Sequence, residues 1–405
     1  VIGAQWGDEG KGKIVDYLAE NAKYVCRFAG GANAGHTLVV DGKKYALHQV
    51  PSGILYPDKT VYLGSGMVIA PDALFDELQM LTEHGIQWEG RVFISDRAHI
   101  VLPCYREMDK KRDAERRQPI GTTGRGIGTA YSQKSERDGI RLADLDWDDK
   151  INALDEADRN FLRPYIDRLL AMRIDIASEM WKNRSENILF EGAQGAMLDL
   201  DSGTYPFVSS GASCSAGAAT GGGIGPRAID KIYGVFKAYE TRVGNGPMPT
   251  EFNTETESEL CEYVRNTGNE FGVTTGRARR CGYLDLVALR YACRVNSIDS
   301  LVLTHLDVYD AMESIEACVA YDIDGKTVTD FPARIPALNN AKPVLKKFNG
   351  WKQPLNDISS YAALPTAAKN YIEFIENFTD TKIGIISVGA DRNQTFLREE
   401  IWSTE

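Results

Sequence analysis

The residues best placed to do chemistry form a glycine-rich loop close to the start of the chain. Residues 7–13, Gly-Asp-Glu-Gly-Lys-Gly-Lys, match the spacing G-x-x-x-x-G-K and lie between a strand-like start and an apolar pattern that predicts a helix. Backbone N–H groups of such a loop, helped by the positive end of the helix, can cradle a polyphosphate, and a lysine supplies a point charge. The loop therefore predicts a local phosphate site; the alternative is a glycine-rich turn with solvated lysines.

Position 14 breaks the pattern of such phosphate loops. Ile14 stands where these loops need a serine or threonine hydroxyl to hold magnesium. A metal ligand must therefore come from elsewhere. Asp8, inside the loop, is the obvious candidate because Mg²⁺ prefers oxygen ligands.

A second glycine-rich run, residues 30–37, follows a predicted strand and contains His36. A lone histidine is more often structural, but this one is flanked by glycine and small polar residues rather than by an apolar stripe. A carboxylate and an imidazole near one triphosphate offer a base and an acid for proton-coupled phosphoryl transfer. We therefore expect Asp8 and His36 to share a site.

These loops need a scaffold, and the apolar pattern of the chain predicts an α/β fold. Helical patterns occupy 72–84 and 151–182, and strands that alternate with helices indicate a large, mostly parallel central sheet flanked by helices. The Gly-, Ala- and Ser-rich stretch 192–226 is interpreted as a functional loop system, not as an interdomain linker. Short apolar segments predict buried strands at 23–28, 60–64, 91–95, 187–190, 231–236, 299–304 and 382–388.

Charge and cysteine usage limit the function classes. The 405 residues carry 57 acidic against 46 basic side chains, a formal net charge of −11, so we expect no nucleic-acid partner. The seven cysteines are odd in number and include no Cys-x-x-Cys pair, which favours reduced thiols in the cytoplasm over a disulfide framework or a zinc site. No apolar run approaches the roughly 20 residues that span a bilayer, so we expect neither a membrane partner nor a signal peptide.

Separated glycine-rich and polar motifs follow in order along essentially the whole chain, at 6–13, 33–37, 121–128, 190–195, 241–244, 272–277 and 387–389. Together these motifs resemble the adenylosuccinate synthetase family. The resemblance implies a single P-loop-NTPase-like α/β domain over residues 1–405, with helical and loop insertions around 100–185 and 192–226. It also implies a homodimer.

The resemblance implies a GTP-dependent ligase that joins L-aspartate to IMP, the first committed step of AMP synthesis from IMP. The γ-phosphoryl group of GTP would move to O6 of IMP, and aspartate would then displace phosphate at C6 to give adenylosuccinate. Phosphorylation is needed because the oxygen attached to C6 of the ring leaves poorly as hydroxide. O6 becomes nucleophilic only when N1 of the purine has lost its proton.

The resemblance assigns catalytic roles to four residues. Asp8 would take the proton from N1 and bind Mg²⁺ together with the backbone carbonyl of Gly35. His36 would donate a hydrogen bond or a proton to the phosphoryl group in transfer. Lys13 and Gln194 complete the set, and Gln194 would hold the purine edge.

The same motif matches supply the binding residues. For GTP they are Gly7, Glu9, Gly10, Lys11, Gly12, Gly35, His36, Thr37, His305, Asp307, Ser387 and Gly389. For IMP they are Asp8, Lys11, Asn33, Thr123, Arg137, Gln194, Ser209, Val243 and Arg277. For aspartate they are Val273, Thr274, Thr275, Arg277 and Arg279. Arg137 would arrive from a neighbouring subunit, and guanidinium forks suit the two carboxylates of aspartate.

Guanine selection would rest on Asp307, whose carboxylate can accept hydrogen bonds from N1–H and N2–H of guanine together, a pattern that adenine cannot offer. Several positions depart from the family pattern: His305 replaces lysine, Ala390 replaces proline, and Ser209 replaces threonine. The segment 141–190 is shorter than in common bacterial members, and 211–215 departs from the usual Asn-Thr-Thr pattern. These changes leave the catalytic pair intact but permit an altered substrate preference.

Two other functions stay open. One is a paralogue that acts on another purine monophosphate such as dGMP, which the retention of Asp8 argues against. The other is a GTP-binding switch without synthetase chemistry, in which His36 and the loop 274–280 would have no purpose. Hydrolysis of GTP without IMP would favour the switch, whereas dependence on IMP and aspartate would favour the synthetase.

Overall fold

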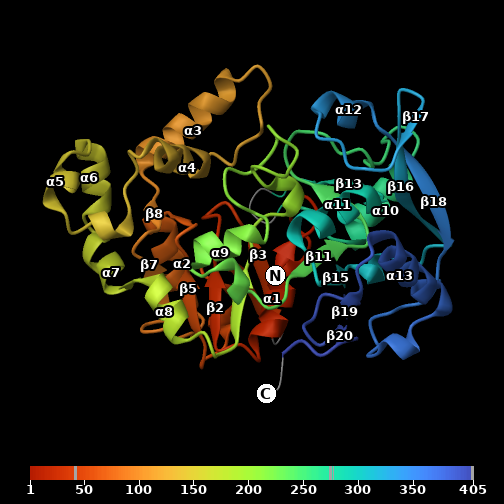
Figure 1. Ribbon diagram of the computed structural model, residues 1–405, viewed down its shortest axis with the longest axis horizontal. Coiled ribbons are helices and arrows are strands. Elements are labelled where there is room, and N and C mark those ends of the chain that lie inside the picture. The colour runs from red at the N-terminus through yellow and green to blue at the C-terminus, as the bar shows by residue number, and fades with distance from the viewer. Residues whose placement is uncertain (41–42, 273–275, 277, 403–405) are drawn as a thin grey trace.

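The computed structural model describes residues 1–402 apart from 41–42, 273–275 and 277. Two five-stranded sheets lie side by side at its centre (Figure 1). One contains parallel strands in the order β10 (Ile188–Glu191), β2 (Tyr24–Arg27), β5 (Thr60–Leu63), β7 (Val92–Ser95) and β9 (Arg173–Ile174). The other has the order β1 (Ile2–Gly3), β11 (Tyr233–Lys237), β15 (Ser300–Thr304), β19 (Ile383–Ser387) and β20 (Thr395–Leu397), and its last strand runs antiparallel to β19.

The two sheets meet at the first residue of the chain. The amide of Gly192 donates to the carbonyl of Val1 at 2.9 Å, and the amino group of Val1 donates to the carbonyl of Phe190 at 2.8 Å. The strands thus form one large, mostly parallel sheet. The predicted fold class is confirmed.

All seven predicted strands are present, as β2, β5, β7, β10, β11, β15 and β19. Their apolar runs are continuous because a parallel sheet is covered on both faces. In β15, for example, Leu301 and Leu303 belong to one core cluster, whereas Val302 between them belongs to another.

Helices cover both faces of the first sheet. Val61 of β5 shares a core cluster with α1 (Lys11–Ala19) and α2 (Pro71–Glu83), which confirms the helix predicted at 72–84. The next residue, Tyr62, points to the other face and clusters with α8 (Ile176–Lys182), beside α9 (Ala216–Gly222). On the second sheet, α11 (Leu286–Asn296) and α13 (Thr366–Thr379) pack against β15.

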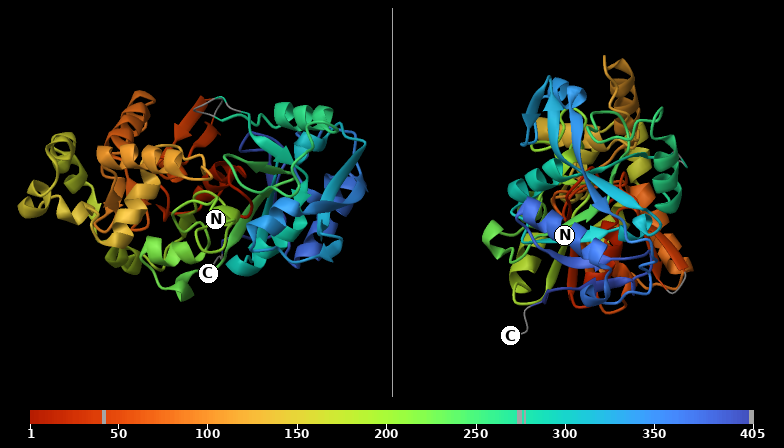
Figure 2. Two further views of the ribbon diagram at one scale, coloured as in Figure 1. Left: turned by 90° about the horizontal axis from the view of Figure 1, so that it is seen from above. Right: turned by 90° about the vertical axis from the view of Figure 1, so that its right-hand side faces the viewer.

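The helical pattern predicted at 151–182 is broken into short pieces. It becomes α5 (Asp148–Asn152), α6 (Glu156–Leu162), α7 (Ile166–Ala171), strand β9 and α8. Pro164 lies between α6 and α7, and proline cannot donate the backbone hydrogen bond that a continuous helix needs there. With α3 (Pro103–Glu115) and α4 (Ile127–Glu136), helices α5–α7 form one end of the molecule (Figures 1 and 2).

The opposite end carries a mostly antiparallel sheet that the sequence did not predict (Figure 2). Strand β16 (Ser314–Ile323) pairs antiparallel with β17 (Lys326–Val328) and β18 (Lys342–Asn349), and parallel with the short β14 (Leu284–Asp285). Smaller pairs are β3 (His36–Val40) with β4 (Lys43–Leu47), β6 (Val68–Ile69) with β8 (His99–Ile100), and β12 (Glu240–Arg242) with β13 (Arg280–Gly282). The remaining helices are α10 (Ser258–Thr267), α12 (Ile335–Asn340) and the 3₁₀ turns η1 (Ser52–Leu55), η2 (Leu142–Asp144), η3 (Ala196–Leu198), η4 (Pro226–Ala228), η5 (Leu306–Tyr309) and η6 (Tyr361–Ala363).

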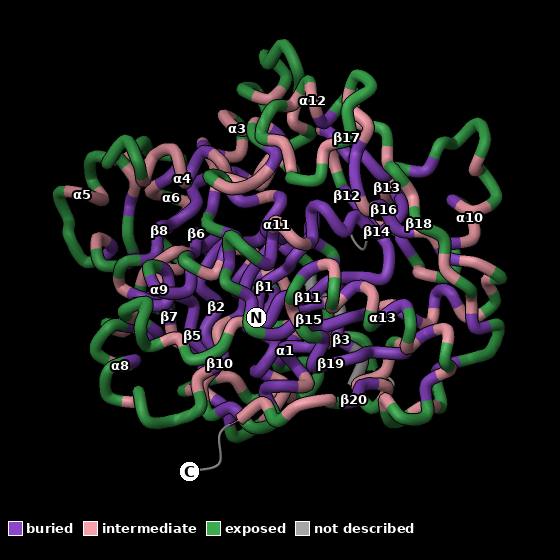
Figure 3. The backbone as a smooth tube through the Cα atoms, turned by 45° about the vertical axis from the view of Figure 1, so that its right-hand side comes forward, coloured by how far each residue is buried: buried purple, intermediate pink, exposed green. Residues whose placement is uncertain are grey.

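Burial is concentrated in the central strands and in the helix faces that cover them (Figure 3). All seven cysteines are free thiols, and six of them are buried. Across the described ranges of the chain, we find no helix that is both long and apolar enough to cross a membrane.

Candidate active site

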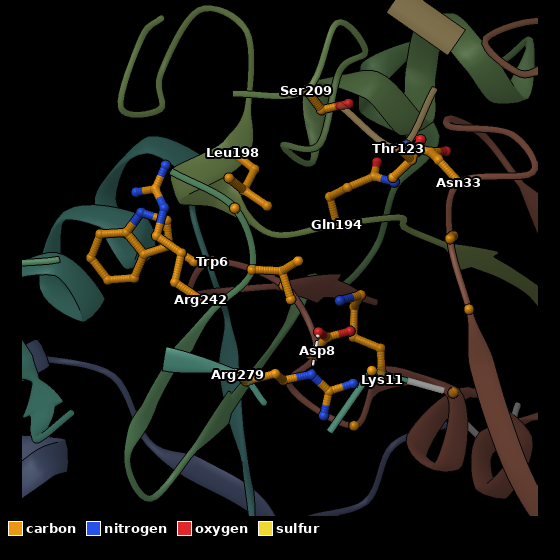
Figure 4. A pocket seen from close by; sticks show the side chains of 18 of the residues that line it. Trp6, Asp8, Lys11, Asn33, Thr123, Gln194, Leu198, Ser209, Arg242 and Arg279 are labelled. Atoms are coloured by element: carbon orange, nitrogen blue, oxygen red, sulfur yellow. Dashed lines mark ion pairs between the residues drawn. The ribbon is translucent and has the colours of Figure 1, made fainter. Parts of the chain in front are cut away.

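A cleft of about 930 Å³ opens above the carboxyl ends of the central strands (Figure 4). Its wall comes from loops that follow β1, β2, β10, β15 and β19, and from the segments before α4 and after β12. Ligands of open parallel sheets bind at this edge because loops from several strands converge there. The cleft collects residues from motifs that lie hundreds of positions apart in the sequence.

The phosphate loop is held in shape by a buried carboxylate. Glu9 is fully buried, and its Oε1 accepts hydrogen bonds from the amides of Gln5 at 3.2 Å and Gly7 at 2.8 Å, while its Oε2 pairs with the ammonium of Lys11. The hydroxyl of Thr304, at the end of β15, donates to the carbonyl of Glu9 at 2.7 Å. The Glu9 side chain therefore supports the loop from inside, whereas Gly7, Gly10, Lys11 and Gly12 line the cleft.

Left-handed backbone at three positions turns the loop into the cleft. Gly7 and Gly10 have φ values of 86° and 82°, which glycine adopts without strain, and Asp8 has φ 59°. Gly10 caps α1, so the N-terminus of that helix points its free N–H groups towards the cleft. Ile14 is fully buried in the core, which explains why this position carries no hydroxyl.

The Asp8 carboxylate reaches the cleft and pairs with Arg279. Its Oδ2 lies 2.9 Å from Nε of Arg279, and its side chain is 35% exposed. Figure 4 shows Asp8 between Lys11 and Arg279, with Gln194 on the other side of the cleft. Gly35 lines the same cleft and is exposed. Of His36 and Thr37 only the backbone is described, as the start of β3.

Lys13 lies at the end of the cleft formed by the C-terminal motif. Its ammonium donates to the hydroxyl of Ser387 and to the carbonyl of Gly389, both at 2.7 Å. Burial lowers the pKa of Lys13 to about 8, although the charges of Asp307 and Asp391 oppose this shift. Lys13, Ser387 and Gly389 are thus brought together at one end of the cleft.

His305 and Asp307 line the same end of the cleft. His305 precedes η5 with φ 56°, and its Nδ1 lies 3.3 Å from the hydroxyl of Tyr239. Burial and then the charge of Lys237 lower the pKa of His305 to about 4, so the ring is neutral at neutral pH. Burial raises the pKa of Asp307, because removal from water disfavours its charged form.

Four of the residues expected to bind IMP face the other side of the cleft. Figure 4 shows Asn33, Thr123 and Gln194 close together, with Ser209 beyond them. Each comes from a different segment, and Val243, 59% exposed, lines the cleft as well. Polar side chains and one exposed apolar side chain suit a phosphorylated nucleoside.

Two groups of predicted residues are not among the described residues that line the cleft. Arg137 ends α4 with φ 72° and is exposed, outside the described lining of the cleft. Outside the described residues lie Val273, Thr274, Thr275 and Arg277, and their role in binding aspartate remains a prediction. From the expected aspartate-binding set, Arg279 lines the cleft.

The sequence did not predict three side chains that hold the cleft residues in place. Asp113 accepts hydrogen bonds from the amides of residues 120, 121 and 122 at 2.8–3.0 Å and so holds the turn that presents Thr123. The buried Arg242 donates to the carbonyls of Phe207 at 2.8 Å and Pro247 at 2.7 Å, which fixes the loop that presents Val243. The third, Glu270, lies behind Arg279. Sequence offers no signal for such roles except their closeness to the motifs.

The chain matches known proteins over its whole length. Residues 1–396 match the family model described as adenylosuccinate synthetase. The chain is 47% identical over 428 residues to an adenylosuccinate synthetase of Clostridium novyi, with 99% of both chains covered. It is 45% identical over 425 residues to that of Gloeothece citriformis, covering 99% of this chain and 94% of the other.

Two solved structures share the fold. Fully ligated adenylosuccinate synthetase from Plasmodium falciparum matches with a TM-score of 0.92 at 37% identity, covering 98% of this chain and 99% of that one. The succinoaminodeoxyadenylate synthetase of cyanophage S-2L, bound to dGMP and dATP, matches with a TM-score of 0.64 at 19% identity, covering 98% of this chain and 93% of that one. At that identity the second likeness concerns the fold alone.

Proposed function

The chain belongs to the adenylosuccinate synthetase family, and from this premise we propose that its cleft binds GTP along the phosphate loop, IMP beside Gln194, and L-aspartate at Arg279. The enzyme is a GTP-dependent ligase that forms a C–N bond. It converts GTP, IMP and L-aspartate to GDP, phosphate and adenylosuccinate through 6-phosphoryl-IMP, the first committed step of AMP synthesis from IMP.

The catalytic roles that we propose rest on the position of Asp8 in the cleft. Its left-handed backbone places the carboxylate between the phosphate loop and Arg279, where it can accept the N1 proton of IMP while a triphosphate lies on the loop amides. Loss of this proton puts negative charge on O6 and makes it a nucleophile towards the γ-phosphoryl group. Gln194 would hold the purine edge, and His36 would donate to the phosphoryl oxygens as their charge develops.

Aspartate would enter at the Arg279 end of the cleft. The Nε edge of Arg279 is occupied by the Asp8 carboxylate, which has the same chemistry as a substrate carboxylate. We propose that the substrate replaces Asp8 on this edge, with Arg277 and residues 273–275 completing the site. The exchange would free Asp8 for catalysis and point the substrate amine at C6.

The residues at the cleft fit magnesium. In the described part of the chain there is no cluster of three or more histidine, cysteine or acidic side chains. Mg²⁺ at a nucleotide needs only one or two protein oxygens, because phosphates and water fill its other positions. We propose that Asp8 and the carbonyl of Gly35 supply them; the ion would neutralise charge on the transferring phosphate.

The remaining binding roles follow the same division of the cleft. We propose that Gly7, Gly10, Lys11 and Gly12 bind the GTP phosphates with Lys13 in support, and that the base contacts Asp307. Glu9 would act by shaping the loop. The proposed IMP residues with described side chains in the cleft are Asn33, Thr123, Gln194, Ser209 and Val243.

We also propose a cytoplasmic homodimer in which the whole chain forms one domain. The hydrogen bonds that join the two sheets at Val1 support one domain, and the free cysteines suit a reducing compartment. Arg137, exposed at the end of α4, would complete the IMP site of the other subunit.

The function is tested by adenylosuccinate formation, followed by absorbance, with each substrate omitted in turn. We expect product only with GTP, IMP, aspartate and magnesium together, little with ATP, and none with Asp8→Asn, which keeps the shape but cannot take the proton. GTP hydrolysis without IMP would instead support a switch. Consumption of dGMP in place of IMP would support the paralogue, with residues 211–215 as the place to look.

A further inference from the structure

Behind the cleft wall, one buried carboxylate contacts groups that lead to both ends of the active site. Glu270 is fully buried, and its Oε2 accepts a hydrogen bond from Nη1 of Arg279 at 2.7 Å. Its Oε1 accepts from the ammonium of Lys237 at 2.5 Å and from the hydroxyl of Tyr239 at 2.6 Å. The same Tyr239 hydroxyl lies 3.3 Å from Nδ1 of His305.

We propose that Glu270 is a positioning residue that holds the aspartate-binding Arg279 and the nucleotide-side His305 in their working orientations. This inference rests on the proposed function of the cleft. Arg279 and His305 both line the cleft, whereas Glu270 acts on them from behind: directly on Arg279, and through Tyr239 on His305.

The charges around Glu270 explain why the arrangement is stable. Asp8, Arg279, Glu270 and Lys237 alternate in sign along a chain of contacts, with ion pairs of 2.9, 2.7 and 2.5 Å. Burial disfavours a charged Glu270, but the surrounding cations, Lys237 first among them, lower its pKa to about 2. Glu270 is therefore ionised at neutral pH.

The guanidinium of Arg279 is divided between two carboxylates. Nη1 is fixed to Glu270, and the Nε edge faces Asp8 in the cleft. Because the guanidinium is planar, fixing Nη1 also sets the direction of the Nε edge. When a substrate carboxylate replaces Asp8, Arg279 meets it already oriented, which reduces the entropy lost on binding.

The hydrogen bonds from Glu270 through Tyr239 to His305 fix the tautomer of the His305 ring. The Tyr239 hydroxyl has one proton, and its short bond to Glu270 uses that proton, so its oxygen is left to accept from His305. Nδ1 of His305 then carries the ring proton, and Nε2 is an acceptor. A Cβ on Gly10 would lie 3.7 Å from this Nε2, so the acceptor faces the phosphate loop.

The test compares KM values for the three substrates in Glu270→Gln, which keeps the shape but removes the charge. Losing one charge-assisted hydrogen bond should raise KM for aspartate about 10- to 100-fold and KM for GTP several-fold. KM for IMP should stay within about twofold, because the IMP side of the cleft is held by other contacts. Glu270→Asp, which keeps the charge, should recover part of the aspartate effect.

Two further variants separate positioning from general damage. Tyr239→Phe removes the hydroxyl that joins Glu270 to His305 but leaves the bond between Glu270 Oε2 and Arg279, so KM for GTP should rise while KM for aspartate is unchanged. Glu251→Gln is the matched control: the exposed Glu251 accepts a hydrogen bond at 2.8 Å from Arg280, the neighbour of Arg279 at the start of β13, and its loss should change none of the three values.

The outcomes distinguish the two proposals. A wild-type protein that makes no adenylosuccinate would overturn the proposed function itself. If the wild type is active but Glu270→Gln raises the three KM values equally, or lowers only kcat, Glu270 merely stabilises the fold and the inference is wrong. A larger aspartate effect in Tyr239→Phe than in Glu270→Gln would also contradict it.

Discussion

At the scale of single residues, sequence predicted the side chains that face the cleft better than those that hold them. Asp8 and Gln194 stand in motifs and Asp307 follows an apolar strand, whereas Glu270 acts through contacts that only folding creates. Lys13 supports a pH prediction. Burial lowers its pKa to about 8, so the cation that is proposed to support GTP binding is lost as pH rises through that value. We expect kcat/KM for GTP to fall above about pH 8, because this ratio reports groups of the free enzyme. In Lys13→Arg the falling limb should move well above pH 9, since arginine stays charged; an unmoved limb in an active variant would contradict the assignment.

At the scale of elements, apolar runs revealed the seven central strands because burial on both faces leaves no polar alternation. Strands β16 and β18 were missed because neither is a continuous apolar run: Glu316 interrupts β16, and β18 mostly alternates exposed and half-buried residues. The loop after β10 gives a prediction. A Cβ on Gly195 would lie 2.6 Å from the backbone nitrogen of Gly7, too close for any real contact. Gly195→Ala should therefore displace the phosphate loop, lower the free energy of unfolding by about 1–3 kcal/mol and raise KM for GTP. Gly225→Ala meets open space and is the control. Equal melting temperatures and equal KM for GTP in both variants would show that the loop is not held this way.

At the scale of the whole molecule, the active site is proposed to need two chains. Arg137 is exposed at the end of α4, outside the described cleft lining, and is proposed to act in the site of the other subunit. Asp8→Ala and Arg137→Ala should each be nearly inactive alone. In a mixed dimer one site combines the intact Asp8 of one subunit with the intact Arg137 of the other, so random exchange should restore about a quarter of wild-type sites. Activity that stays at the sum of the two single variants, after subunit exchange is verified, would place Arg137 in its own subunit's site or outside catalysis.

The measurement that tests the mechanism most directly follows the oxygen at C6 of IMP. If the γ-phosphoryl group of GTP moves to O6 and aspartate then displaces phosphate, the C6 oxygen must leave with the phosphate. With IMP labelled by ¹⁸O at O6, mass spectrometry should find one ¹⁸O in the released inorganic phosphate for each adenylosuccinate formed. Unlabelled phosphate alongside adenylosuccinate would contradict the phosphorylated intermediate, and with it the roles proposed for Asp8 and the phosphate loop.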